Sequence, residues 1–214
     1  HSSAVMLGVG GAIISGATMV LRKKFSVRAF SKDCLDHGIT AVQYIGELCR
    51  YLKDAPPEEA DALLDIRIAF GNGLRADVWE GFRRRYGIRH VVEFYAATES
   101  NIATFSLDKV GACGFVPRFA NFIYPVKIVR TDSSNPGVPL RNPETGFCSL
   151  CGPGEPGLVL GEINNRRADR RFDGYTDPRA TQSKVVTDVF RRGDAFFNTS
   201  DVLYQTGSGY FYFA

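Results

Sequence analysis

The chain has 214 residues, of which 44% are hydrophobic and 23% are charged. This composition is that of an ordinary globular protein, so it disfavours a disordered chain, a collagen and a coiled coil. The 26 basic and 23 acidic residues leave a net charge of +3, which is too small and too dispersed to indicate a nucleic-acid or membrane-surface partner. The five cysteines are odd in number and widely spread, which favours a reducing compartment and free thiols.

The first patterned segment is apolar but rich in glycine. Four glycines interrupt residues 4–21. The segment is therefore a poor membrane span, because crossing a bilayer takes about 20 predominantly apolar residues. Within it, residues 17–21 predict a strand. Residues 26–37 then predict a helix that ends at Gly38.

Strand and helix patterns alternate up to residue 95. Residues 39–42, 66–70 and 90–95 are short β-rich runs, and apolar residues recur at helical spacing from 45 to 52 and from 74 to 82. Strands that alternate with helices usually pair in parallel through right-handed crossovers. We therefore expect a layered α/β sheet, with functional groups in the loops that follow the carboxyl ends of its strands.

The pattern changes after about residue 105. Helical periodicity fades, glycine and proline become frequent, and short β-rich runs cover residues 126–130 and 157–163. The runs 202–205 and 210–213 flank a glycine-containing turn and predict a hairpin. We therefore predict a partial α/β subdomain over residues 1–105 and a β-rich subdomain over residues 106–214.

Three motifs carry little functional weight. The glycines at positions 8, 10 and 11 lack the Lys-Ser/Thr ending of a phosphate loop and the dinucleotide spacing, so turn geometry or close packing explains them better. Cys148 and Cys151 have the spacing of a redox or zinc pair, but no second pair follows, and two thiols in a loop is the simpler interpretation. The arginine clusters at 83–85 and 166–171 are bordered by acids and fit solvated faces, with phosphate or anionic-lipid contact as the alternative.

A sharper signal lies at residues 93–99, where Tyr95, Thr98 and Glu99 leave the end of a predicted strand together. An aromatic face can stack on a purine, a hydroxyl can donate to a phosphate oxygen, and a carboxylate can hold Mg²⁺. These residues suit an ATP site, and they also fit an ordinary strand end with a capped turn. Asp201 has two interpretations as well: an acceptor for a ribose diol, or a turn aspartate at a strand start.

Seven ordered runs give the sequence a family resemblance. It resembles the very long-chain acyl-CoA synthetase, or fatty acid transport protein, family of the adenylate-forming superfamily. The runs are Arg22 to Ser26, Val42 to Leu52, Gly71 to Arg75, Val110 to Phe115, Gly154 to Gly157, Arg171 to Tyr175 and Asp188 to Asp194. The resemblance implies α/β layers followed by a β-barrel-like subdomain, both belonging to the large N-terminal domain of such an enzyme.

The resemblance also implies a fatty acid–CoA ligase that uses ATP, Mg²⁺ and CoA to activate a long-chain or very long-chain fatty acid through acyl-AMP. Thr98 and Glu99 are its implied catalytic residues. The implied roles are adenine stacking for Tyr95, phosphate contact for Thr98, Mg²⁺ binding for Glu99, ribose binding for Asp201, and lining of the adenine and acyl-adenylate edge by the backbone of Gly71, Asn72, Gly73 and Leu74.

The sequence departs from the family pattern at three positions. Ala96, Ser100 and Ser200 stand where many relatives have glycine, and each added Cβ is tolerable only if φ is negative there. The resemblance places a lysine-bearing phosphate loop before His1, and a hinge, a catalytic lysine and a mobile C-terminal domain after Ala214. We therefore expect the 214 residues alone to be inactive.

Two other functions remain as alternatives. The first is a non-catalytic fatty-acid-binding or transport-associated module. The second, a nicotinamide dehydrogenase, is disfavoured because no fingerprint glycines follow a predicted strand. The resemblance further implies an intracellular, membrane-associated protein of the endoplasmic reticulum, peroxisome or plasma membrane, attached through segments outside this chain. No nucleic-acid partner is expected.

Overall fold

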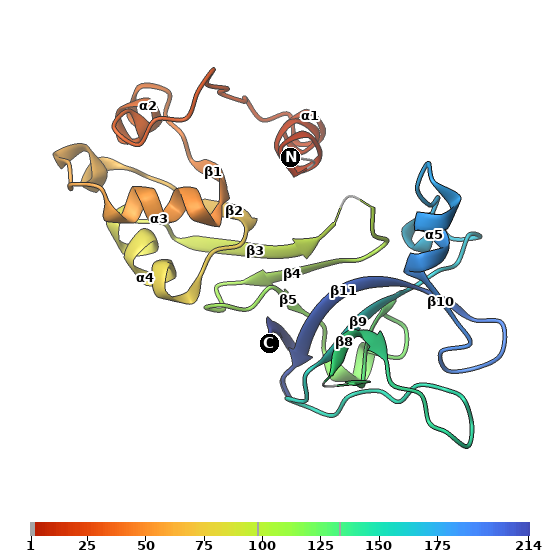
Figure 1. Ribbon diagram of the computed structural model, residues 1–214. Coiled ribbons are helices and arrows are strands. Elements are labelled where there is room, and N and C mark those ends of the chain that lie inside the picture. The colour runs from red at the N-terminus through yellow and green to blue at the C-terminus, as the bar shows by residue number, and fades with distance from the viewer. Residues whose placement is uncertain (1–2, 98, 133) are drawn as a thin grey trace. The chain divides into compact units, whose positions relative to one another are not determined.

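The computed structural model describes residues 3–97, 99–132 and 134–214. The chain divides into two compact units (Figure 1). The first unit comprises residues 1–94 and 106–111, and the second comprises residues 95–105 and 112–214. The predicted boundary between residues 105 and 106 stays a prediction.

The first unit is built around parallel strands that alternate with helices. Its elements, with two strands that continue into the second unit, are η1 (Ala4–Gly10), α1 (Gly11–Ser15), α2 (Phe30–Asp36), β1 (Ala41–Ile45), α3 (Gly46–Asp54), η2 (Glu59–Leu63), β2 (Ile68–Asn72), α4 (Ala76–Arg85), β3 (His90–Ala96) and β4 (Ala103–Leu107). The sheet order is β1-β2-β3-β4, and β2 pairs in parallel with both β1 and β3. The predicted parallel α/β sheet is thereby confirmed.

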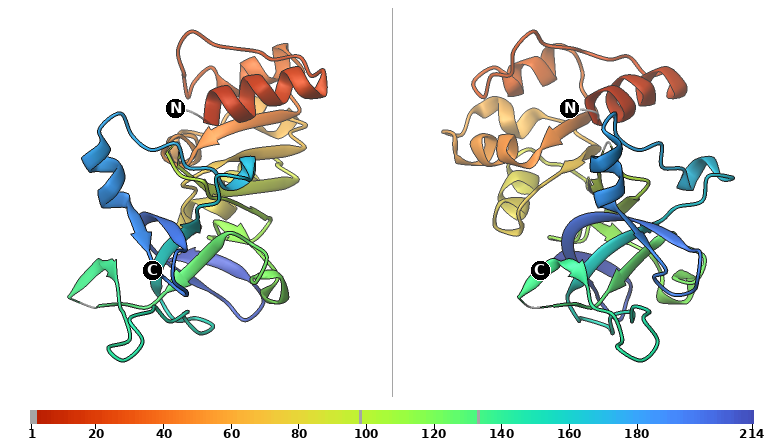
Figure 2. Two further views of the ribbon diagram at one scale, coloured as in Figure 1. Left: turned by 90° about the vertical axis from the view of Figure 1, so that its right-hand side faces the viewer. Right: turned by 45° about the vertical axis from the view of Figure 1, so that its right-hand side comes forward.

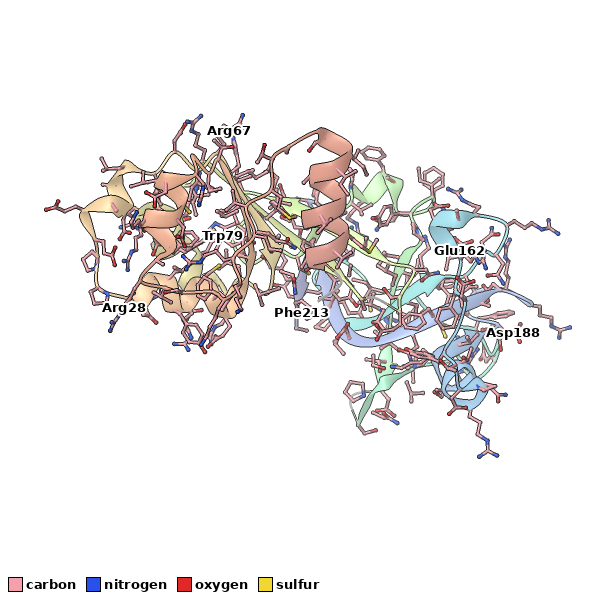
Figure 3. All side chains as sticks on the ribbon, turned by 90° about the horizontal axis from the view of Figure 1, so that it is seen from above. Arg28, Arg67, Trp79, Glu162, Asp188 and Phe213 are labelled. Carbon is pink, nitrogen blue, oxygen red and sulfur yellow. The ribbon has the colours of Figure 1, made fainter. Side chains whose placement is uncertain are left out.

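Helix α4 supplies much of the core of this unit. Its apolar residues Val78, Trp79 and Phe82 recur at helical spacing, and each is at most 1% exposed (Trp79 is labelled in Figure 3). Tyr86 follows the helix, is equally buried, and donates its hydroxyl to the carbonyl of Leu52 at 3.1 Å. Because burying a large apolar side chain contributes about 1.5–3 kcal/mol, this helix face fixes α4 against the rest of the unit.

The N-terminal segment differs from the prediction. Residues 17–22 form no strand and are exposed, and the helix that follows is α2 rather than the longer run expected from residue 26. An exposed segment without a neighbouring strand cannot form a ladder of backbone hydrogen bonds, so β propensity alone does not make it a strand. The segment before it folds into η1 and α1. No helix among the described residues is long and apolar enough to cross a membrane.

The second unit is predominantly antiparallel. Its elements are β5 (Gly114–Phe115), η3 (Arg118–Ala120), β6 (Val126–Val129), β7 (Thr131–Asp132), β8 (Asn135–Pro139), β9 (Gly157–Glu162), η4 (Ala168–Arg170), α5 (Pro178–Lys184), β10 (Val185–Thr187), β11 (Ala195–Gln205) and β12 (Tyr210–Phe213). The main sheet has the order β5-β12-β11-β9-β6, with β10 on β11, and all of these pairings are antiparallel.

The long strand β11 curls through this sheet (Figure 2). It pairs with β12 in the predicted hairpin and with β9 on its other side. Leu158, Val159 and Leu160 of β9 are fully buried, so this strand is covered on both faces. The β-rich second half expected from the sequence is confirmed.

Candidate functional site

The loop that follows β2 is shaped by two glycines. A Cβ built on Gly71 would lie 2.2 Å from the carbonyl oxygen of Tyr44, so only glycine permits this approach of β2 to β1. Gly73 has φ of +79°, in the left-handed region that glycine adopts without strain. Between them, Asn72 has a buried Oδ1 atom for which the described residues supply no hydrogen-bond donor. The loop therefore contains one buried acceptor that no described residue engages.

A buried carboxylate from β3 holds the same loop. Glu93 is 4% exposed, and its Oε2 accepts a hydrogen bond of 2.6 Å from the hydroxyl of Tyr44. Its Oε1 accepts from the backbone amides of Gly73 and Leu74, the latter at 3.2 Å. Burial raises the pKa of Glu93 to about 7, although these hydrogen bonds favour the charged form and act in the opposite direction.

Two of the predicted site residues meet in the second unit. The hydroxyl of Tyr95, at the end of β3, donates to Oδ2 of Asp201 on β11 at 2.6 Å. Tyr95 is 8% exposed, and its ring meets that of Phe213 edge to face, with centroids 5.7 Å apart. Burial, and then the hydrogen bond to Asp201, raise the pKa of Tyr95 well above its ordinary value, so the phenol keeps its proton.

An irregularity in β11 presents Asp201. The register of β11 against β9 shifts between Asn198 and Val202. At this bulge the hydroxyl of Thr199 donates to the carbonyl of Val159 at 3.0 Å and accepts from the amide of Asp201 at 3.1 Å. Bulges re-aim side chains that a regular ladder would alternate between two faces. Among the described residues, no hydrogen bond engages the second oxygen of Asp201.

Ser200, inside the bulge, has a strained backbone. Its φ is +66°, which lies in the left-handed region that strains a residue with a Cβ. The condition that φ be negative at this position is therefore not met. Ala96 and Ser100, the other two positions where many relatives have glycine, do not have positive φ. The Ser200 hydroxyl accepts a hydrogen bond of 2.8 Å from Nζ of Lys184 at the end of α5. Ser200 thus combines a strained backbone with a side-chain hydrogen bond that glycine could not form.

Of the two catalytic candidates, Glu99 lies in the turn after β3. Thr98 lies outside the described residues. Glu99 is exposed. The pKa of Tyr175 is raised first by the burial of Tyr175 itself and second by the negative charge of Glu99. Within the described residues, no group of three or more His, Cys, Asp or Glu side chains could hold a metal ion. A single carboxylate still fits Mg²⁺ bound to a nucleotide, because that ion keeps waters and takes phosphate oxygens as its other ligands.

Sequence reasoning did not assign a role to Glu93 or Tyr44. The signal was present, since a carboxylate in the middle of the apolar strand β3 must find buried hydrogen-bond donors. Which donors it finds depends on strand order, because Tyr44 is on β1 and the amides follow β2. The cysteines of the disregarded motif are free thiols, and Cys148 is buried.

The family of the chain follows from its sequence match. Residues 1–144 match the family described as AMP-binding enzyme. The chain belongs to the AMP-binding enzyme family. The resemblance to fatty acid transport proteins is confirmed by sequence relatives of the chain. Long-chain fatty acid transport protein 1 of Mus musculus is 45% identical over 214 residues, which are 100% of this chain and 33% of the mouse protein.

A second sequence relative and one solved structure are also similar to this chain. Long-chain fatty acid transport protein 3 of Homo sapiens is 42% identical over 215 residues, covering 100% of this chain and 31% of the human protein. The chain thus spans about a third of the length of these relatives. The crystal structure of ATP-bound MatB from Rhodopseudomonas palustris superposes with a TM-score of 0.70 at 22% identity, over 100% of this chain and 37% of that one, which shows a shared fold.

Proposed function

We propose that this chain supplies part of an AMP-forming ligase that activates a long-chain or very long-chain fatty acid with ATP and transfers the acyl group to CoA. The observation that carries the proposal is the 2.6 Å hydrogen bond between Tyr95 and Asp201. An adenosine ligand joins its base directly to its ribose, so a ring for the base and an acceptor for the sugar must be neighbours. The names of the relatives, long-chain fatty acid transport proteins, support the fatty acid.

The proposed roles divide the nucleotide among the candidate residues. Tyr95 stacks on adenine, and Asp201, whose Oδ2 is engaged by Tyr95, offers Oδ1 to a ribose hydroxyl. The backbone of residues 71–73 lines the adenine edge. The hydroxyl of Thr98 contacts phosphate oxygens.

The proposed reaction has two balanced steps. A carboxylate oxygen of the fatty acid forms a bond to the α-phosphorus of ATP, the bond from that phosphorus to the bridging oxygen breaks, and pyrophosphate leaves. The CoA sulfur then bonds to the acyl carbon, the acyl carbon–oxygen bond breaks, AMP leaves, and the thiol proton is released. Mg²⁺, which Glu99 would hold, supplies charge stabilisation at the phosphates. The chain's own residues bind and orient the nucleotide.

Nucleotide binding and turnover test this proposal separately. We expect the 214-residue chain to bind ATP·Mg²⁺ in calorimetric titrations and to release no pyrophosphate. In a full-length protein that carries these residues, Glu99→Ala should abolish fatty-acid-dependent pyrophosphate release, because the phosphates lose the metal-holding carboxylate. Glu80→Ala is the matched control, since Glu80 is an exposed glutamate on α4. Unchanged pyrophosphate release by the Glu99 variant would remove Glu99 from the mechanism.

The word transport in the names of the relatives favours a second candidate, a fatty-acid-binding module without catalysis. Such a module binds a long-chain fatty acid whether or not ATP is present. A ligase of the proposed kind instead forms acyl-AMP only when ATP and fatty acid are both supplied. Titrating the full-length protein with fatty acid, with and without ATP·Mg²⁺, and assaying for acyl-AMP distinguishes the two.

A further inference from the structure

Glu93 is a carboxylate placed where a strand is otherwise apolar. Its neighbours Val91 and Phe94 on β3 are buried, and Glu93 itself is 4% exposed. Among the described residues, the influences on its pKa are burial and hydrogen bonds from Tyr44, Gly73 and Leu74, with no cationic side chain. A buried carboxylate without a cation is costly to the fold unless hydrogen-bond donors surround it. The donors it has therefore indicate what it does.

Those donors converge from the loop after β2 and from β1. Two successive amides, of Gly73 and Leu74, point at the same oxygen of Glu93, which the left-handed conformation of Gly73 permits. Tyr44 donates to the other oxygen at 2.6 Å. The amides precede α4, whose N-cap residue Arg75 makes no side-chain capping hydrogen bond. Without Glu93, both amides would be left as unsatisfied donors near the start of this helix.

We propose that Glu93 is a positioning residue, which fixes the backbone of residues 73 and 74 and thereby holds the loop that lines the adenine edge of ATP. The inference rests on the proposed function for its ligand, and on the hydrogen bonds above for its geometry. Glu93 acts through the loop: its oxygens are occupied by Tyr44 and the two amides, so the nucleotide meets Asn72 and its neighbours instead.

The groups that face Glu93 also set its response to pH. Tyr44 faces it from β1, Cys49 from α3, and the amides of residues 73 and 74 from the loop. Burial, and then the charge of Glu93, raise the pKa of both Tyr44 and Cys49, so both stay neutral near pH 7. The protonated carboxyl keeps one acceptor oxygen for the amides but loses the stronger, charge-assisted bond. The loop is accordingly held by both forms, and more tightly by the carboxylate.

Three substitutions separate positioning from simple packing. Glu93→Leu removes the acceptor at similar volume, Glu93→Gln keeps an acceptor oxygen without the charge, and Glu93→Asp keeps the charge but shortens the side chain. Tyr44→Phe is the matched control, because it removes a donor to Glu93 without touching the amides. In the full-length protein, Glu93→Leu should raise the KM for ATP by about tenfold, with a smaller change in kcat.

The rescue pattern completes the expectation. Glu93→Gln should keep the KM for ATP within about threefold of wild type and flatten its change between pH 6 and 8, and Tyr44→Phe should leave KM nearly unchanged. Backbone hydrogen exchange in the 214-residue chain gives a readout that needs no turnover. Exchange at residues 73 and 74 should accelerate by about tenfold or more in Glu93→Leu and remain near wild type in Glu93→Gln.

The possible outcomes distinguish a failure of the positioning role of Glu93 from a failure of the proposed ligase function. A normal KM for ATP in Glu93→Leu, with faster exchange at residues 73 and 74, would overturn the positioning role and leave the proposed function intact. Unchanged exchange would overturn the hydrogen-bond geometry itself. If wild type forms no acyl-AMP, the proposed function fails, while the exchange data still decide whether Glu93 holds the loop. Should Glu93→Leu not fold, Glu93→Asp replaces it, with an expected rise in KM of about threefold or more.

Discussion

Replacing Glu93 with glutamine should change how the stability of the chain depends on pH. Burial raises the pKa of Glu93 to about 7 from an ordinary value of 4.5. The native state therefore favours the protonated carboxyl, and the stability contributed by this group is present below about pH 4.5 and is lost as the pH rises through 7. The difference of about 2.5 pKa units corresponds to about 3 kcal/mol. Glutamine cannot ionise, so Glu93→Gln should escape this loss.

Urea denaturation of the 214-residue chain at pH 5, 6, 7 and 8 measures the effect. The free energy of unfolding of Glu93→Gln minus that of wild type should increase by about 2–3 kcal/mol from pH 5 to pH 8, because every other titration is common to both proteins and cancels. Glu80→Gln, which changes an exposed glutamate in the same unit, controls for the loss of a carboxylate. Parallel pH profiles for wild type and Glu93→Gln would refute the reasoning.

Three further substitutions test local geometry by the same denaturation assay. Ser200→Gly should stabilise the chain by about 1 kcal/mol, because φ of +66° strains serine but not glycine; a loss of stability would show that the Lys184 contact outweighs the strain. Gly71→Ala should destabilise it by about 1–3 kcal/mol, since the new Cβ would lie 2.2 Å from a carbonyl oxygen, and an unchanged free energy would contradict this close approach. Tyr95→Phe should cost about 1–2 kcal/mol by removing the bond to Asp201, and a neutral result would mean that water replaces it.

Sequence periodicity located the regular elements well where packing and pattern agree. The alternation that predicted β1, α3, β2, α4 and β3 is found as a parallel sheet with helices, and the terminal hairpin of β11 and β12 is found as expected. Each helix has an apolar face at 3.6-residue spacing, which is visible in sequence. Residues 17–21 show the limit, because their β-rich composition has no adjacent strand to pair with, and pairing is a tertiary property.

The sequence predicted the parts of the candidate site that lie within one short run of residues, but not the contacts between distant segments. The run that contains Tyr95 indicated a site because an aromatic ring and a carboxylate follow one strand. Asp201 had two interpretations from the residues alone, and the family resemblance favoured ribose binding. Their hydrogen bond joins residues 106 positions apart in sequence. It depends on the shift in register between β11 and β9, and a shift of one residue reverses which side chains face which side. The hydrophobic periodicity of the sequence does not predict such a shift in register.

Glu93 and Asp201 illustrate two ways in which a fold prepares a polar group. Glu93 is buried, and both of its oxygens accept hydrogen bonds from groups of the protein, which suits a residue that fixes a loop. Asp201 is only partly buried, and one of its oxygens is engaged by Tyr95 while the described residues leave the other without a hydrogen bond. A saturated carboxylate has no capacity left for a ligand, whereas a half-saturated one retains it. Counting used and unused acceptors therefore separates the residue that positions from the residue that binds, although both are acids on strands of a β-sheet.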